Sequence, residues 1–592
     1  MRVTWIDSNN DRYYYITKSV RDGKKIKSVT VKKLGKLSEL GYKSHEEALK
    51  ELKEIAKEFS IKNKDSNLVT VSINVSKSLD DTNNKNTISN ELNIGYLYLN
   101  KIYKDLGLSE YFKSLKKDKY KIKYNLDEIV KLLVFSRILN PKSKLGTFND
   151  AYKMFGFSDI DLENIYRSLD ILKENNDKIQ ETIYKNSDNV YKRDTRILYY
   201  DCTNFFSEKE YEDLDVIKDD EIITGLRKYG VSKENRPNPI VEVGLFMDKS
   251  GIPLAINIYP GNTNEQLTCI PLEKKIIKDY SLSKFIYCSD AGLGSMDIRK
   301  FNSFNNRAFV ITRSVKKLSN IAKNIIFDDN NWRDKDNKIV NLSKIKENID
   351  DLNTYYKVLD YYEDTELGIK IDGKKKVSFK QKLVVTYSNK YKEYQKRIRL
   401  NQIERAKKLI KNGSFDKENI NSPKRYILKN YVTYNGEKAE YKIPELDYKK
   451  IDEESLYDGY YSVITNLEGS PKEIIRINEN RWEIEESFRI MKTNLKSRPF
   501  YLSTKEHIEA HFLICFIALT IFRILEKELD NRYTVDEIIS NLKNINVCPL
   551  KNETIYSSLY KESEFINLLD KKTNIKLSKE AFYINELKKY SK

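Results

Sequence analysis

The succession of short strands and helices between residues 196 and 312 constrains the fold of this chain more than any other feature. Segments rich in β-branched and aromatic residues alternate there with segments whose apolar residues repeat at helical spacing. We predict strands at 196–200, 241–247, 253–259, 284–288 and 308–312, and helices at 265–280 and 295–304. The predicted order is therefore three strands, a helix, a strand, a helix and a final strand.

This order is that of a ribonuclease H-like α/β fold, in which the first and fourth strands are neighbours in the sheet. Asp201 follows the first predicted strand, and Asp290 follows the fourth strand after Ser289. The two aspartates are therefore expected to end neighbouring strands. Two acids at strand ends, together with a third acid on a later helix, are the parts of a two-metal site.

The third acid, Glu485, lies in a helix predicted for residues 481–498, a segment without Pro or Gly and with few β-branched residues. At about 100° per residue, Arg481, Glu485 and Lys492 fall on one side of this helix, next to an apolar stripe. One carboxylate is then held between two cations at the edge of a buried face. The alternative interpretation is an ordinary amphipathic helix with ion pairs four residues apart.

With these three acids the chain resembles the DDE transposases of bacterial insertion sequences. It is similar in particular to the group that carries a Tyr-x2-Arg-x3-Glu-x6-Lys signature. Arg481, Glu485 and Lys492 match this signature, whereas Asn478 stands at the position of the tyrosine. The resemblance covers roughly residues 196–525 firmly and the N-terminal third more loosely.

The resemblance implies an enzyme that cuts the ends of its own element and joins them to target DNA. Asp201, Asp290 and Glu485 are then the catalytic residues and the ligands of two Mg²⁺ ions, for which Mn²⁺ can substitute. Arg481 and Lys492 are expected to bind the DNA phosphates that flank the scissile bond, because arginine suits bidentate phosphate contacts. Simple ion pairing with neighbouring glutamates is the alternative for both cations.

Weaker predictions concern residues around this core. Arg236, which precedes the second strand, is expected to meet DNA phosphate. Trp332 lies in the insertion, where some relatives stack a flipped base, although an isolated tryptophan usually serves packing. Thr203 and Asn204 resemble recurrent family positions that line the site, and turn closure is their alternative role.

Composition limits the partners of the chain. The 592 residues carry a formal net charge of +18, which indicates a polyanionic partner, here double-stranded DNA as terminal inverted repeats and target. Five cysteines and three histidines show neither a disulfide framework nor a zinc motif. The most apolar run, 511–522, is too short for a membrane helix, and no signal peptide pattern opens the sequence. We expect no membrane partner and a bacterial cytoplasmic, nucleoid-associated location.

The N-terminal third contains two basic segments. A hairpin with its turn at Asp22-Gly23 precedes a helix capped by Ser44, and its lysines either grip DNA or are simply solvated. Lysines interleave with Tyr120 and Tyr124 just before a second capped helix, which begins at Asn125. This second segment suits a phosphate backbone and an unstacked base, or is a solvated charge run.

The domain organisation follows from these elements, with a ribonuclease H-like core interrupted by a β-rich insertion and preceded by a helical region and a small β/α module. We predict a β/α module at 1–70, a linker and helical DNA-end-binding region at 71–190, the two parts of the core at 191–315 and 456–530, the insertion at 316–455 and a helical C-terminal segment at 531–592. Two-ended cutting predicts a homodimer in the DNA complex. A nuclease of the same fold that never joins strands and a non-catalytic DNA-binding descendant of a transposase are the alternatives.

Overall fold

The computed structural model describes residues 2–8, 11–22, 25–42, 44–62, 90–157, 159–218, 221–366, 376–412, 422–431, 442–550 and 554–592. Contacts within the chain define two compact units. The smaller unit comprises Met1–Leu97, Tyr152–Ser158 and Asn541–Lys592, and the larger unit comprises Tyr98–Ala151 and Asp159–Ser540.

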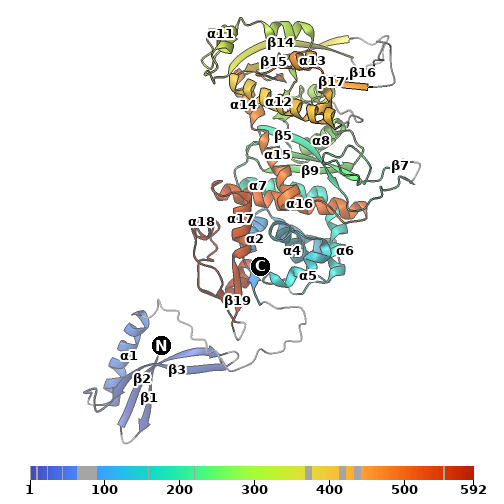
Figure 1. The fold of residues 1–592 in the computed structure, drawn as a ribbon. Helices are drawn as coiled ribbons and strands as arrows, with labels where there is room; N and C mark the ends of the chain where they lie inside the picture. Colours follow the sequence, from blue (N-terminus) through green and yellow to red (C-terminus); the bar gives the residue numbers. More distant parts are fainter. Residues whose placement is uncertain are drawn as a thin grey trace. The chain divides into compact units, whose positions relative to one another are not determined.

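A ten-stranded mixed sheet forms the centre of the larger unit (Figure 1). Five of its strands are those predicted from the sequence: β5 (Ile197–Phe206), β8 (Ile240–Asp248), β9 (Pro253–Pro260), β10 (Ile286–Ser289) and β11 (Ala308–Thr312). They lie in the order β9-β8-β5-β10-β11, with β10 parallel to both of its neighbours and with β8 antiparallel to β5 and β9. Helices α8 (Cys269–Asp279) and α9 (Met296–Phe301) lie within the predicted helical ranges. The predicted ribonuclease H-like fold class is therefore confirmed.

Strand β5 is longer than the sequence pattern predicts. It continues past Asp201 because residues as far as Phe206 pair with β8. The prediction that Asp201 ends its strand is therefore wrong, and Asp201 lies in the middle of β5. Since successive side chains in a strand point to opposite faces, Asp201 and Thr203 share one face and Cys202 the other.

Helices cover the two faces of the sheet around β5. Tyr199 Oη donates a hydrogen bond to the carbonyl oxygen of Ile477 in α14 (Pro471–Glu479) at 3.0 Å. On the opposite face, Tyr200 Oη lies 2.6 Å from Thr268 Oγ1, directly before α8. Asp201 therefore faces the side of the sheet on which α14 and its successor α15 (Trp482–Arg489) lie.

The insertion between the two parts of the core extends the same sheet. Its strands are β12 (Trp332–Arg333), β13 (Ile339–Val340), β14 (Tyr355–Glu366) and β15 (Lys376–Tyr387). They join β11 through β18 (Tyr460–Thr465), the strand that returns the chain to the core as predicted. The insertion also carries helices α10 (Asn320–Phe327), α11 (Leu342–Glu347), α12 (Asn389–Lys411) and α13 (Tyr448–Ser455), and the separate hairpin β16 (Ile427–Tyr431) and β17 (Lys442–Leu446). The strand predicted at 431–434 falls mostly outside the described residues.

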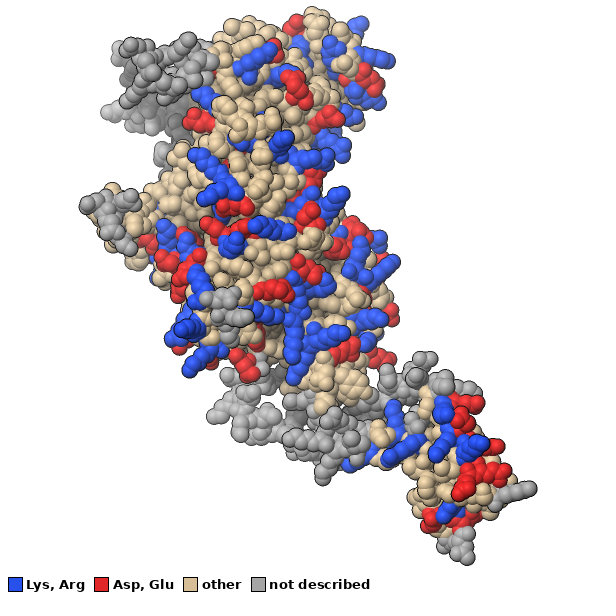
Figure 2. All heavy atoms as spheres, turned by 180° about the vertical axis from the view of Figure 1, so that it is seen from behind, with Lys and Arg blue, Asp and Glu red and all other residues tan. Residues whose placement is uncertain are grey.

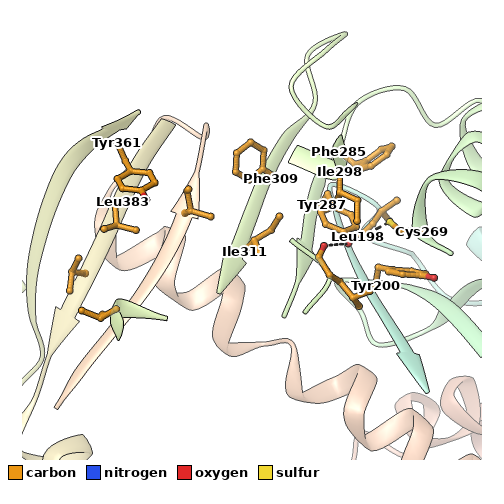
Figure 3. Packing of buried hydrophobic residues seen from close by; sticks show 14 of the residues in the cluster. Leu198, Tyr200, Cys269, Phe285, Tyr287, Ile298, Phe309, Ile311, Tyr361 and Leu383 are labelled. Atoms are coloured by element: carbon orange, nitrogen blue, oxygen red, sulfur yellow. Dashed lines mark hydrogen bonds between the residues drawn. The ribbon is translucent and has the colours of Figure 1, made fainter. Parts of the chain in front are cut away.

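One hydrophobic core runs along the sheet from the ribonuclease H-like strands into the insertion (Figure 3). Leu198 and Tyr287 lie toward one end of it, Ile311 lies in the middle, and Leu383 on β15 lies at the other end. All four are at most 1% exposed. Because the core is continuous, the insertion packs against the ribonuclease H-like strands within the same sheet and does not form a separate appended domain.

Helices fill the rest of the larger unit. They are α3 (Leu108–Asp118), α4 (Leu126–Leu139), α5 (Lys144–Asp150), α6 (Leu162–Glu174), α7 (Asn176–Val190) and α16 (Lys505–Glu528). Helix α16 contacts both α4 and α6. In the part of the chain that the structure describes, α16 alone has the length and apolarity of a membrane span, and its apolar stretch is entirely buried in the protein. It is the core helix that the sequence predicts, although it extends well beyond the run 511–522, so the prediction that this segment is too short for a membrane helix is wrong.

The smaller unit contains the predicted N-terminal module. Strands β1 (Arg2–Ser8), β2 (Asp11–Asp22) and β3 (Lys25–Lys36) form an antiparallel sheet next to α1 (His45–Lys62). Ser44 Oγ accepts a hydrogen bond from the backbone N–H of Glu47 at 3.2 Å, which is the predicted helix cap. The tip of the hairpin and most of the predicted linker fall outside the described residues.

The C-terminal segment differs from the helical prediction. Besides α17 (Val535–Asn544), α18 (Glu564–Thr573) and α19 (Ile584–Ser591) it contains β19 (Asn546–Pro549), β20 (Ile555–Ser558) and β21 (Ala581–Tyr583). Strand β19 pairs with β4 (Leu92–Asn93), which precedes α2 (Tyr96–Asp105). The partner of β19 in β4 lies more than 400 positions away and cannot be read from a local pattern, whereas β20 and β21 pair with strands close by in the sequence and were missed.

Candidate active site

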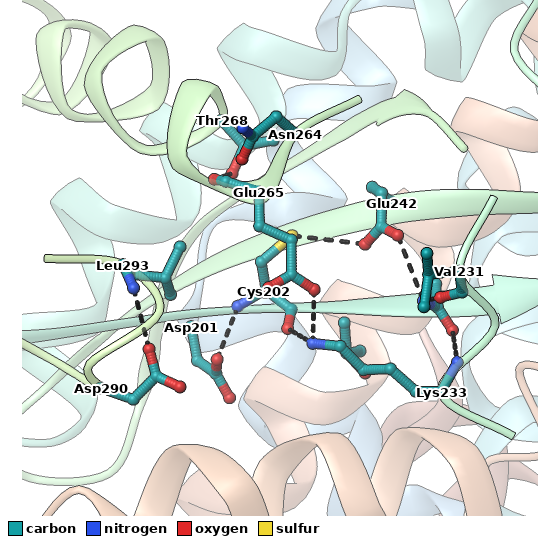
Figure 4. A network of polar contacts seen from close by, with 12 residues as sticks. Asp201, Cys202, Val231, Lys233, Glu242, Asn264, Glu265, Thr268, Asp290 and Leu293 are labelled. Atoms are coloured by element: carbon teal, nitrogen blue, oxygen red, sulfur yellow. Dashed lines mark hydrogen bonds and ion pairs between the residues drawn. The ribbon is translucent and has the colours of Figure 1, made fainter. Parts of the chain in front are cut away.

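Asp201 lies on β5, and Asp290 directly follows the neighbouring parallel strand β10, as predicted for Asp290. Residue Cys288 on β10 pairs with Tyr199 on β5, and each aspartate follows two positions further along the chain, Asp201 within β5 and Asp290 one residue past the end of β10. Figure 4 shows the two carboxylates side by side. The sheet register thus brings together two of the three predicted acids.

Burial and charge both act on Asp201. The loss of water around its carboxyl group is the main cause that raises its pKa to about 6, and the negative charge of Asp290 raises the pKa further. Lys233 and Arg481 oppose this shift. Each aspartate uses one oxygen in a hydrogen bond, to the N–H of Cys202 at 2.8 Å and to the N–H of Leu293 at 3.0 Å. The second oxygen of each aspartate forms no hydrogen bond among the described residues.

Glu485 lies on α15 and is turned toward Arg481. Its Oε1 is 2.9 Å from Arg481 Nη1, and its side chain is 54% exposed. Arg481 in turn lies close enough to Asp201 to lower the pKa of that aspartate. Arg481 therefore interacts with both the late glutamate and Asp201. It is one of the two cations that the sequence analysis placed next to Glu485.

Lys492 lies in an irregular turn that follows α15. The helix widens into a π-helix at Ile490–Asn494, and the extra residue in each π turn changes the direction of every side chain that follows. Lys492 Nζ donates a hydrogen bond to Thr203 Oγ1 at 2.7 Å and lies 3.5 Å from Glu234 Oε1. Burial lowers the pKa of Lys492 to about 8. Lys492 therefore lies over β5 and contacts Thr203, two positions after Asp201, and it forms no ion pair with Glu485 among the described residues.

Asn478, which stands at the signature tyrosine position, is buried beneath Arg481. Its Oδ1 accepts a hydrogen bond from Thr312 Oγ1 at 3.2 Å, and its amide contacts the hydroxyl of Tyr461 on β18. Burial raises the pKa of Tyr461, and the hydrogen bond to Thr312 and the positive charge of Arg481 partly oppose that shift. The hydroxyl group of Tyr461, on strand β18, therefore lies next to the signature tyrosine position, which Asn478 occupies on helix α14.

The loop before β8 contributes two charges that the sequence analysis missed. Lys233 Nζ lies 2.6 Å from both the carbonyl oxygen of Cys202 and Glu265 Oε1 (Figure 4). Glu234 forms ion pairs with both Lys492 and Arg498. The only signal for this loop was its run of charged residues, from which the analysis selected Arg236.

Arg236 and Trp332 show no link to the acids. Arg236 is exposed, and its guanidinium carbon lies 5.4 Å from the ring centroid of Phe206 at the end of β5. Trp332 is fully buried, and its Nε1–H donates to the carbonyl oxygen of Asp328 at 3.0 Å. Because no face of its ring is accessible, the prediction that Trp332 stacks a flipped base is not supported.

A second polar cluster lies on the opposite face of β5. Its ligand atoms, from Cys202, Glu242 and Glu265, lie within 4.8 Å of one another, and they are the sole trio of this kind among the described residues. Lys233 already pairs with Glu265, and burial raises the pKa of Glu242 to about 7. The cluster thus has its own counter-charge, and the predicted catalytic acids are not part of it.

These observations first define a class of protein. A ribonuclease H-like sheet with one carboxylate on a central strand, a second directly after the neighbouring strand and a glutamate on a later helix is the framework of metal-dependent enzymes that act on phosphodiesters. Residues 241–521 match the family model described as a transposase DDE domain. Residues 4–65 match the model described as the N-terminal domain of IS1634 family transposases. The chain belongs to the DDE transposases of bacterial insertion sequences, a family of enzymes that use divalent metal ions.

Two solved structures are also similar to this chain. The piggyBac transposase synaptic complex with hairpin DNA is 9% identical, with 84% of this chain and 83% of that chain covered and a TM-score of 0.34. The Mos1 transposase paired-end complex is 11% identical, with 35% and 66% covered and a TM-score of 0.14. Such scores are too low to define a fold, so the family assignment rests on the two sequence models. No curated protein matches the chain significantly.

Proposed function

We propose that this transposase cuts the ends of its insertion sequence and joins them to target DNA, with Asp201, Asp290 and Glu485 as its catalytic carboxylates. The observation that carries the proposal is the pair formed by Asp201 on β5 and Asp290 directly after β10, where burial and the charge of Asp290 raise the pKa of Asp201. Two carboxylates this close in a partly dehydrated site favour a bound cation, which offsets their repulsion.

Mg²⁺, or Mn²⁺ in its place, fits the donor set because hard cations prefer carboxylate oxygens. Asp201 and Asp290 would hold the ions with their free oxygens, and Glu485 would join them after it leaves Arg481. When bound, the ions supply an activated water or 3′-hydroxyl and stabilise the leaving oxyanion. With a pKa of about 6, Asp201 is ionised at neutral pH and so is ready to bind a cation.

The chain's own cations would position the DNA. Arg481 loses Glu485 as its partner when that glutamate turns to a metal ion, and its guanidinium then becomes available to a phosphate. Lys492 lies over β5 and reaches Thr203, so it would hold the phosphate next to the one that is cut. Lys233 balances the charge behind Asp201.

The partners and the setting follow from this chemistry. The substrates are the double-stranded terminal inverted repeats and the target DNA, and the net charge of +18 favours such polyanions. The N-terminal module and the helical region before the core would recognise the ends. A homodimer would cut both ends in the bacterial cytoplasm, associated with the nucleoid.

Substitution of the three acids tests the proposal. Asp201→Asn, Asp290→Asn and Glu485→Gln should each abolish Mg²⁺-dependent cleavage of an end-bearing duplex, while DNA binding stays close to that of the unmodified protein. Glu479→Gln, which changes an exposed acid shortly before the same helix, is the matched control and should cut normally. Normal cleavage by all three variants would refute the assignment.

A strand-transfer assay separates the remaining functions. Cleavage that is never followed by joining to target DNA would identify a nuclease of the same fold. DNA binding without any cleavage by the unmodified protein would identify a non-catalytic descendant.

A further inference from the structure

A cavity of about 560 Å³ lies among α4, α5, α6 and the segment that follows the π-helix. Five basic residues line it, and none of its lining residues is acidic. The five are Arg137, Lys142, Lys144, Lys496 and Arg498. This concentration of one sign of charge is local, because basic and acidic side chains are interspersed over the molecular face that Figure 2 shows.

Lys144 is the unusual member of this group. It is only 4% exposed, and its Nζ has no hydrogen-bond partner within the described structure. Burial, together with the charge of Arg137, lowers the pKa of Lys144 to about 7. A buried amine without a partner destabilises a fold, because its lost hydration is not replaced. Among the described residues, no hydrogen bond of the Lys144 amine offsets this cost in stability.

The neighbours of Lys144 leave its charge uncompensated. Arg137 uses its Nη atoms to bind the carbonyl oxygens of Leu495 and Lys142, at 3.3 and 3.0 Å, and its Nε has no partner. His511 Nε2 lies 3.3 Å from the carbonyl oxygen of Ser497, and burial lowers the pKa of His511 well below its ordinary value. Backbone carbonyl groups hold both side chains in place. The donors that remain without a partner in the part of the chain that the structure describes, Arg137 Nε and Lys144 Nζ, are suited to bind an anion.

Aromatic side chains form part of the wall. Tyr166, Phe500 and Tyr501 line the cavity, and Tyr501 is 56% exposed at its rim. The volume falls within the roughly 300–1,000 Å³ that small-molecule sites occupy, well above the need of a phosphate alone. Basic groups next to aromatic faces are the means by which proteins hold unpaired nucleotides.

We propose that this cavity binds an unpaired nucleotide of the DNA substrate, with its phosphate on Lys144 and Arg498 and its base against Tyr501. The nucleotide must be unpaired because a base inside a duplex cannot enter a pocket. The inference rests on the proposed action on DNA and names a contact outside the carboxylate site.

A chain of contacts connects the cavity to the candidate active site. Arg498 lines the cavity and pairs with Glu234, which also lies 3.5 Å from Lys492. Lys492 in turn reaches Thr203, two positions after Asp201. Glu234 thus pairs with two cations in the way that a DNA phosphate would. A DNA strand whose phosphate replaced the Glu234 carboxylate would extend from the catalytic acids to the cavity.

Binding of labelled end-bearing duplexes to the full-length protein in EDTA tests the proposal, since no cleavage is required. One duplex is blunt and the other carries a short single-stranded overhang. We expect the protein to prefer the overhang, and Lys144→Met to weaken overhang binding by about tenfold, the value of one charge-assisted hydrogen bond. Lys278→Met changes an exposed lysine of α8, so it is the matched control and should keep the preference. Equal binding of both duplexes by the unmodified protein, or an unchanged preference in Lys144→Met, would overturn the proposal.

Two further measurements separate nucleotide binding from effects of misfolding and from a general affinity for phosphate. Tyr501→Ala changes a half-exposed ring, so it should fold normally and lose part of the overhang preference. Thymidine monophosphate should raise the melting temperature of the unmodified protein but not that of Lys144→Met, whereas an equal effect of inorganic phosphate would overturn the nucleotide assignment. Asp201→Asn should keep the overhang preference, so failure of the cavity and failure of the proposed catalysis are distinguishable.

Discussion

Replacement of Lys144 by methionine should stabilise the protein, and the gain should depend on pH. The pKa of Lys144 in the folded protein is about 7, against an ordinary value of 10.5. Between these two pH values the unfolded chain binds a proton that the folded chain has lost, so the contribution of Lys144 to stability rises with pH. At or below pH about 7 its full destabilisation is present, and Lys144→Met removes it.

The shift from 10.5 to about 7 sets the size of this effect. At about 1.36 kcal/mol for each unit, the gain from Lys144→Met is at most about 5 kcal/mol near neutral pH. It should shrink toward zero as the pH approaches about 10. Each kcal/mol corresponds to a melting temperature increase of roughly 2–4 °C in a domain of about 200 residues, and less in a larger unit.

Thermal unfolding of the unmodified protein and of Lys144→Met over a pH series measures this difference. Both proteins keep Arg137 and His511, the basic groups next to Lys144, so the difference in stability between them reports the removal of the Lys144 amine. Lys121→Met, at an exposed position, should show a small difference that does not change with pH. If Lys144→Met were less stable at neutral pH, or if its effect did not vary with pH, the argument for an uncompensated buried charge would be refuted.

Three other predictions concern the candidate active site. Because the pKa of Asp201 is about 6, the cleavage rate should fall by about tenfold for each unit below that pH, and a higher metal concentration should move the midpoint down. Gly292→Ala would place a methyl group 3.3 Å from Asp290 Oδ1 and should raise the Mg²⁺ concentration needed for half-maximal cleavage, whereas Gly469→Ala, with 3.9 Å to its nearest neighbour, should not. Glu234→Gln removes the carboxylate that holds two cations, so DNA binding should tighten and its dependence on salt should steepen.

Separate measurements check these three expectations. A pH–rate profile without a fall below pH 6 would contradict the assignment of Asp201 as a cation ligand. Unchanged Mg²⁺ dependence in Gly292→Ala would show that the carboxylate of Asp290 has room to move. Glu210→Gln, at an exposed position in the same part of the chain, is the control for Glu234→Gln, and equal salt dependence of the two variants would exclude competition by Glu234.

The sequence by itself determined the elements whose signals are local. Ser44 and Asn125 cap their helices as predicted, because a capping side chain binds an N–H group only three positions away. The strands around 241–247 and 308–312 and the apolar run of α16 were likewise readable, because burial imposes a period on neighbouring residues. The order of these elements was enough to predict the ribonuclease H-like topology and two adjacent aspartates.

Only the tertiary structure decided which side chains meet. Asp201 lies within β5 and not at its end because β8 pairs beyond it, and Lys492, in the π-helical turn Ile490–Asn494, reaches Thr203. The partnership of Glu234 with two cations and the isolation of Lys144 depend on segments hundreds of positions apart. A local pattern specifies a helix or a strand, whereas the charge around a side chain depends on every segment packed against it.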